Sequence, residues 1–199
     1  LDFIKSDFKG KNKPIVAILR NSTAFGKSPF TDIFFAKAKN LNIDIVEEIV
    51  ELNAKEADAQ MKNIIEKKAD YCIIQETLGA TIAILKSSST QKYQGKLIGL
   101  NWAFNEALIA VLQKDCEGYL GFPLFAQWSE DNNGIKTIKN YIKSKYGAET
   151  KQHSKYIAGW ASAQVLAEGL KKVKDYNSGE SIKAAFESLK NYNVDGLCP

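Results

Sequence analysis

The most constraining feature of the sequence is an apolar run at residues 15–19, which leads into a short polar segment at 21–24 and then into a helical pattern. Five consecutive apolar residues are too uniform for a strand with one face in water and too few for a buried helix. Such a run is typical of a parallel strand covered by helices on both faces. Ligands bind at the carboxyl ends of such strands, so the polar segment is a candidate binding loop.

The same strand-then-helix unit repeats along the first 122 residues. Further strands are expected at 43–50, 71–74, 96–100 and 118–122, and helices at about 28–40, 54–68, 80–88 and 105–113. Five strands alternating with four helices predict an α/β fold, a doubly wound parallel five-stranded sheet with flavodoxin-like strand order. The inner faces of the first two helices are expected to carry Phe30, Ile33, Phe34, Ala38, Met61, Ile64 and Ile65.

After Pro123 the strand pattern stops and only helices are expected, at about 134–146, 156–173 and 179–189. The apolar face of the middle helix, which includes Ile157, Trp160, Val165 and Leu170, has no strand of this chain left to cover. Another lobe or a second copy of the chain is expected to cover it. The chain therefore divides into a helix end and connector (1–12), an α/β ligand-binding lobe (13–123) and a helical segment (124–199).

Charge and cysteine content narrow the class of protein. The 27 Lys and Arg residues exceed the 23 Asp and Glu residues by four, and the lysines are spread over many segments. This favours a solvated surface over a nucleic-acid interface. No apolar run reaches the roughly 18 residues of a membrane span, and the first residues lack a signal-peptide pattern. Cys72 lies in an expected strand, whereas Cys116 and Cys198 could pair if the fold brings them together.

Residues for catalysis, metal binding or nucleotide binding are not apparent. The only histidine, His153, lies in a polar connector, which disfavours a Ser-His-Asp or Cys-His arrangement. The scattered cysteines do not have the spacing of zinc ligands, and no G-x-G-x-x-G or Walker pattern follows the first strand. A phosphoacceptor receiver domain would need an acidic cluster at the strand ends, where Glu76 is the one carboxylate. We therefore expect no catalytic residue, no metal and no cofactor.

The expected strand ends instead carry neutral hydrogen-bonding groups and aromatic rings, which suit the binding of a small molecule. Loop capping or packing is an alternative role for any one of these residues. Three loops that converge on one edge of a sheet nevertheless favour a ligand site. The candidate ligand-binding residues are Ser22, Thr23, Phe25, Gln75, Glu76, Thr77, Asn101, Trp102 and Phe104.

Several short segments, in this order and spacing, resemble the type I periplasmic solute-binding proteins of branched-chain amino acid ABC transporters and their amide, urea and aromatic-acid relatives. The resemblance covers nearly the whole chain. It rests on Ala24-Phe25-Gly26, where the family usually has Tyr-Gly, on Ala57-Asp58, Lys68-Ala69-Asp70-Tyr71, Ile98-Gly99-Leu100-Asn101-Trp102, Glu117-Gly118-Tyr119, Tyr156-Ile157-Ala158-Gly159-Trp160 and Asp195-Gly196-Leu197.

The resemblance implies a two-lobed protein that closes on a small ligand and delivers it to an ABC transporter permease. The chain would be the second lobe with the helices that return to the first, and its signal peptide would lie outside these residues. An extracytoplasmic location follows, periplasmic or extracellular, with membrane association through the transporter. The resemblance implies neither an enzyme nor a nucleic-acid partner, and the helices after Pro123 are expected to allow self-association.

The resemblance also suggests roles for single residues. Phe25 matches the aromatic residue that packs on the ligand, and Gln75 to Thr77 lie in the loop that forms a second wall. Asn101 stands where amino-acid binders often have an acid for the ligand's ammonium group, so Glu76 could supply that charge, or the ligand carries no ammonium. An amino acid, an amide or an aromatic acid is the expected ligand. The alternatives are a sensing domain of a receptor or regulator and, less favoured, an enzyme on the same sheet.

Overall fold

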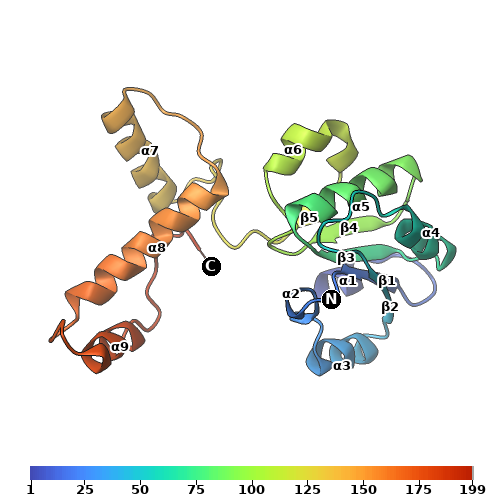
Figure 1. The fold of residues 1–199 in the computed structure, drawn as a ribbon, viewed down its shortest axis with the longest axis horizontal. Helices are drawn as coiled ribbons and strands as arrows, with labels where there is room; N and C mark the ends of the chain where they lie inside the picture. Colours follow the sequence, from blue (N-terminus) through green and yellow to red (C-terminus); the bar gives the residue numbers. More distant parts are fainter. Residues whose placement is uncertain (199) are drawn as a thin grey trace. The chain divides into compact units, whose positions relative to one another are not determined.

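An all-parallel sheet of five strands forms the centre of residues 1–122 (Figure 1). The computed structural model describes residues 1–198. The strand order is β2-β1-β3-β4-β5, and in the register of the central pair Ala17 lies beside Cys72. The predicted α/β fold with flavodoxin-like order is confirmed. The strands are β1 (Ile15–Arg20), β2 (Asp44–Ile49), β3 (Tyr71–Gln75), β4 (Lys96–Gly99) and β5 (Leu120–Gly121).

Helices cover both faces of the sheet, as the uniformly apolar central strands require. One face packs through Leu19, Cys72 and Ile74 onto α4 (Asp58–Glu66), α5 (Leu78–Thr90) and α6 (Ala107–Leu112). The other face packs through Val16 and Ile73 onto α1 (Asp2–Asp7) and α3 (Asp32–Asn40). The two helix layers are visible above and below the sheet in Figure 1. Alternate residues of β1 and β3 therefore belong to different cores.

Three helices end in the same way before the next strand begins. Asn42, Lys68 and Lys92 follow α3, α4 and α5 in the left-handed conformation, with φ angles of 56°, 53° and 55°. In each case the next residue's N–H donates back to the carbonyl group five positions earlier, which is the Schellman pattern. The donor and acceptor pairs are Ile43 and Ala38, Ala69 and Ile64, and Tyr93 and Ser88. These turns fix the amino-terminal edge of the sheet.

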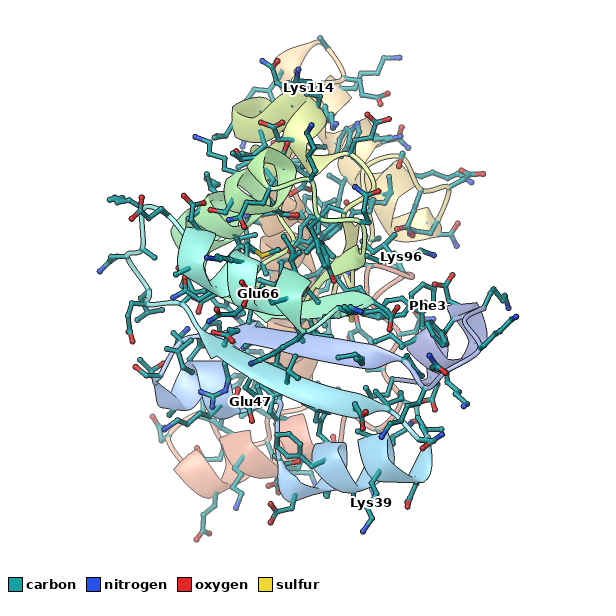
Figure 2. All side chains as sticks on the ribbon, turned by 90° about the vertical axis from the view of Figure 1, so that its right-hand side faces the viewer. Phe3, Lys39, Glu47, Glu66, Lys96 and Lys114 are labelled. Carbon is teal, nitrogen blue, oxygen red and sulfur yellow. The ribbon has the colours of Figure 1, made fainter. Side chains whose placement is uncertain are left out.

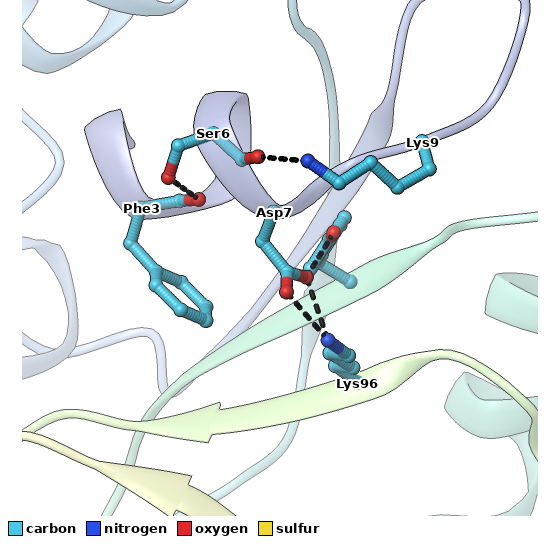
Figure 3. Close-up of polar contacts among 6 residues, drawn as sticks. Phe3, Ser6, Asp7, Lys9 and Lys96 are labelled. Carbon is cyan, nitrogen blue, oxygen red and sulfur yellow. Dashed lines mark hydrogen bonds and ion pairs between the residues drawn. The ribbon is translucent and has the colours of Figure 1, made fainter.

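The short helix α1 is attached to the sheet by its last residue, Asp7 (Figure 3). The Tyr71 hydroxyl of β3 donates to Asp7 Oδ2 at 2.6 Å, and Lys96 Nζ of β4 lies 2.7 Å from both oxygens of the same carboxylate. Ile4 of α1 is buried against the sheet. The helix end expected within residues 1–12 is α1, and α1 belongs to the α/β unit.

The helix expected at about 28–40 is present as α3, which begins four residues later, at Asp32. A separate four-residue helix, α2 (Ala24–Lys27), occupies part of the loop expected before it, and Pro29 lies between the two. Phe34 and Ala38 pack on the sheet as expected, but Ile33, which was also expected on the inner face, is 81% exposed. Ile65 of α4 is also wrongly placed inside, since 36% of it is exposed.

Other elements differ from the expectation in their bounds. The helix expected from residue 54 begins at Asp58, and the strand expected at 118–122 is only Leu120–Gly121. The helix expected at 105–113 is α6, followed by a 3-10 turn, η1 (Gln113–Cys116), where Gln113 has a φ of 49°. Lys39 of α3 and Lys114 of η1 extend outward from the ribbon, in keeping with a solvated lysine surface (Figure 2).

The residues from Pro123 onwards form a second compact unit. Its helices are α7 (Asn133–Tyr146), α8 (Ser154–Lys171) and α9 (Gly179–Glu187). Ile135, Ile138 and Ile142 of α7 pack on Ile157 of α8 and on Leu197. The rest of the apolar face of α8 is exposed, with Val165 at 36%, Leu166 at 53% and Leu170 at 37%.

No helix in the described part of the chain is long and apolar enough to cross a membrane. Cys72 is buried in β3, and Cys116 and Cys198 are half-buried free thiols in different units.

Candidate functional site

The loop after β1 is organised by Asn21, whose side chain is fully buried at the end of the strand. Asn21 Oδ1 accepts a hydrogen bond of 3.1 Å from the Thr23 backbone N–H, which is an Asx turn. This turn directs the chain into α2. A Cβ atom on Gly26 would lie 2.2 Å from the Asn21 carbonyl oxygen, so only glycine lets α2 pack this closely on the strand end.

Glu76 stands at the same edge, directly after β3, and is also fully buried. Its Oε2 accepts hydrogen bonds of 3.2 Å from Asn21 Nδ2 and from the Thr77 backbone N–H. Its Oε1 has no hydrogen-bond partner among the described residues. Burial raises the pKa of Glu76 above its ordinary value, and the two donors counteract the rise only in part. Two predicted site loops are therefore joined by a buried Asn21–Glu76 hydrogen bond.

Phe25 and Trp102 meet although one follows β1 and the other follows β4. Their rings lie edge to face with centroids 6.1 Å apart. Trp102 is 55% exposed and Phe25 is half-buried, so the pair offers an aromatic surface at the carboxyl edge. Gln75 Nε2 donates to the Phe25 carbonyl oxygen at 3.1 Å, which ties the end of β3 to α2.

The remaining predicted site residues have different surroundings. Ser22 and Thr23 are exposed, and Thr77 and Asn101 are half-buried. Phe104 packs on Tyr119 at 5.9 Å between ring centroids, and a Cβ atom on Gly121 would overlap its ring. Phe104 is thus engaged with β5 in this structure.

The segment after β2 also reaches this edge, although it was not among the loops predicted from the sequence. Ser22 Oγ donates to Glu51 Oε2 at 3.3 Å, and Thr77 Oγ1 donates to the Leu52 carbonyl oxygen at 3.4 Å. The predicted parallel sheet could have indicated this segment, because the carboxyl ends of parallel strands meet at one edge and that of β2 must lie near those of β1 and β3. Glu51 is therefore a second carboxylate near the site.

The groups at this edge can donate and accept hydrogen bonds and offer aromatic surface, but they do not form a nucleophile with a base. No cluster of three His, Cys, Asp or Glu residues that could hold a metal ion occurs within residues 1–198. Burial raises the pKa of the Cys72 thiol to about 12, so this thiol stays protonated near neutral pH. His153 Nδ1 accepts from the Lys155 backbone N–H at the start of α8, which is a capping role.

An apolar pocket of about 140 Å³ lies on the α1 and α3 face of the sheet. Phe3, Phe30, Phe34, Ile98 and Phe122 are among its lining residues. None of the predicted ligand-binding residues lines it.

A model of the periplasmic binding protein family matches residues 1–198. The chain belongs to the periplasmic binding protein family. The predicted resemblance is thereby confirmed, and the fold is that of the type I periplasmic binding proteins. A search of curated proteins gave no match.

Solved periplasmic binding proteins share this fold at low sequence identity. A branched-chain amino acid ABC transporter protein from Thermus thermophilus with bound valine is 21% identical, with a TM-score of 0.82 over 100% of this chain and 53% of that chain. A fatty acid ABC transporter substrate-binding protein from Thermomonospora curvata is 18% identical, with a TM-score of 0.84 over 99% of this chain and 51% of that chain. An extracellular ligand-binding receptor from Rhodopseudomonas palustris is 17% identical, with a TM-score of 0.70 over 98% of this chain and 57% of that chain. The chain thus spans about half the length of these proteins.

Proposed function

We propose that the chain is part of an extracytoplasmic solute-binding protein that captures a small polar ligand and delivers it to an ABC transporter permease. The ligand is an amino acid, an amide or an aromatic acid, and it is bound without chemical conversion. The observation that carries the proposal is the carboxyl edge of the sheet, where the Phe25–Trp102 pair lies beside loops of exposed hydroxyl groups. Membership of the family supports binding, and the solved relatives include proteins of amino acid and fatty acid ABC transporters.

The proposed site uses Phe25 and Trp102 as a packing surface and Ser22, Thr23, Gln75, Thr77 and Asn101 as polar contacts, with Phe104 at the rim. Glu76 is withdrawn from the surface and bonded to Asn21, which argues against its use as the counter-ion of a ligand ammonium group. The wall facing this edge would come from a second lobe, on which the helices after Pro123 would pack.

Isothermal titration with valine, phenylalanine, acetamide, urea and benzoate tests the proposal. We expect one of these classes to bind, and Phe25→Ala to weaken its binding at least about tenfold, or about 1.4 kcal/mol. Incubated ligand should be recovered unchanged. Phe35→Ala is a matched control, because Phe35 lies on α3 away from this edge. Failure of every class to bind, or equal binding by both variants, contradicts the proposal.

A sensing domain of a receptor or regulator is the second candidate, because one relative is an extracellular ligand-binding receptor. The two candidates differ in partner. A transport protein should stimulate ligand uptake by vesicles that hold its permease, and uptake that is independent of the protein would favour sensing.

We also propose that the exposed face of α8 allows self-association of this chain. Sedimentation should show a concentration-dependent dimer that Leu166→Ser with Leu170→Ser removes. A chain that stays monomeric at all concentrations contradicts this proposal.

A further inference from the structure

The hydrogen bonds of Glu76 are distributed unequally between its two oxygens. Oε2 accepts from both Asn21 Nδ2 and the Thr77 N–H, and the buried Oε1 has no partner within residues 1–198. An ionised carboxylate shares its charge between both oxygens, so a buried oxygen without a donor is costly. A neutral carboxylic acid has one carbonyl oxygen that accepts and one hydroxyl oxygen that carries the proton. The neutral acid is the less costly form here, because a buried hydroxyl without an acceptor costs less free energy than a buried share of a carboxylate charge without a donor.

The surroundings of Glu76 act in the same direction. The groups that face it are Asn21 from the loop after β1, Thr77 at the start of α5 and Glu51 after β2. Glu51 is the titratable group among them, and its negative charge opposes ionisation of Glu76. No positively charged side chain is hydrogen-bonded or ion-paired to Glu76 in the described chain.

Glu76 is connected to Phe25 through Asn21. The amide of Asn21 bonds to Glu76 through Nδ2 and to the Thr23 N–H through Oδ1, and the Asn21 backbone supports Gly26. A change at Glu76 that moves Asn21 must therefore move the loop that carries Phe25. We infer that Glu76 is a positioning residue, which holds the β1–α2 loop and Phe25 through Asn21, and that the position of this loop depends on whether Glu76 carries its proton.

Ionisation of Glu76 would release a proton to solvent, strengthen the hydrogen bonds that Oε2 accepts from Asn21 and Thr77, and draw water or donors toward the unpartnered Oε1, so the loop would shift. Ligand affinity would then depend on pH through a residue that does not touch the ligand. That last step rests on the proposed function, whereas the movement of the loop with pH does not.

Trp102 provides a readout that needs no ligand, because it contacts Phe25. In a Trp128→Phe/Trp160→Phe background it is the single tryptophan of the chain. Its emission should follow one titration step between about pH 4 and 8, with a midpoint above the ordinary glutamate range. Glu76→Gln, which keeps the carbonyl acceptor and cannot ionise, should remove the step and keep the low-pH spectrum. Glu66→Gln, on the exposed side of α4, should leave the step unchanged.

Two further variants test the connection. Asn21→Ala should reduce or remove the step, because Trp102 no longer senses the protonation of Glu76 through the loop. Glu51→Gln should lower the midpoint, because a like charge is removed. A step that persists in Glu76→Gln, or a Glu76→Gln spectrum that matches the high-pH form, overturns the inference. These results stand apart from ligand titration, so failure of the proposed function would be recognised separately.

Discussion

The Tyr71 hydroxyl donates a 2.6 Å hydrogen bond to Asp7 Oδ2 and so joins the first residue of β3 to the last residue of helix α1. Lys96 forms an ion pair with the same carboxylate. Both contacts lower the pKa of Asp7, and the contact with Lys96 has the larger effect. A carboxyl group whose pKa is lowered in the folded state stabilises the fold at pH values above its ordinary pKa, which is 3.8 for Asp7. That stabilisation is lost as the pH falls through the lower, folded-state pKa.

Asp7→Asn should therefore destabilise the α/β unit at neutral pH and have less effect in acid. The free energy of unfolding, measured with urea from about pH 7 down to 3, should show the difference between variant and wild type shrinking below the ordinary Asp value. Tyr71→Phe removes one hydrogen bond and leaves the Lys96 pair, so it should cost about 1 kcal/mol. A pH-independent effect of Asp7→Asn would contradict this reasoning.

Lys92→Gly should stabilise the chain. Lys92 has a positive φ angle, which costs an L-residue free energy that glycine does not incur. After the larger entropy of glycine in the unfolded chain is subtracted, we expect a gain of about 0.5 to 1 kcal/mol in the free energy of unfolding. Lys86→Gly, in the exposed interior of α5, is the matched control and should lose about 1 kcal/mol. Loss of stability in both variants would show that the Lys92 side chain contributes more than its backbone costs.

Gly26→Ala should damage the loop that presents Phe25. The added methyl group would lie 2.2 Å from the Asn21 carbonyl oxygen, so the strand end or α2 must shift. We expect a cost of about 1 to 3 kcal/mol in thermal unfolding and a change in Trp102 emission. Gly79→Ala meets no atom within 4 Å and should be neutral or stabilising by up to about 1 kcal/mol. Equal behaviour of the two variants would rule out close packing at Gly26.

Glu76→Gln should change the pH dependence of stability. Burial raises the folded-state pKa of Glu76 above its ordinary value of 4.5. Between pH 4.5 and the folded-state pKa, the folded chain therefore binds more protons than the unfolded chain. The contribution of Glu76 to stability is therefore complete below the ordinary value and declines as the pH rises through the folded-state pKa. The glutamine variant lacks this decline. Its free energy of unfolding relative to wild type should rise with pH, and a flat difference would contradict a raised pKa.

The sheet could be predicted from the sequence because its central strands are buried on both faces and are therefore uniformly apolar. The exposure of Ile33 could not, because α3 begins only at Asp32 and Ile33 lies in its first turn. Phe34 and Ala38 of the same expected face do pack on the sheet, so the helical period was predicted correctly. The failure at Ile33 is therefore one of where the helix begins.

At the candidate site, the sequence predicted which loops converge but not which side chains turn inward. Alternation along β3 places Glu76 on the same side as Ile74, toward α4 and α5. The neighbouring segment from Glu51 to Leu52 is held at this edge by hydrogen bonds from Ser22 and Thr77. Such contacts between loops have no periodic signal, which explains why burial of Glu76 was not predicted.

The left-handed helix ends at Asn42, Lys68 and Lys92 all precede strands, whereas every candidate ligand residue lies at the end of a strand or after it. The signals that stop the helices and set the strand register are thus separated from the candidate ligand loops by the length of the sheet. Substitutions that alter the choice of ligand can accumulate at one edge without removing the instructions for folding at the other. The fold can therefore acquire new specificity by exchange of loops, at little risk to its own assembly.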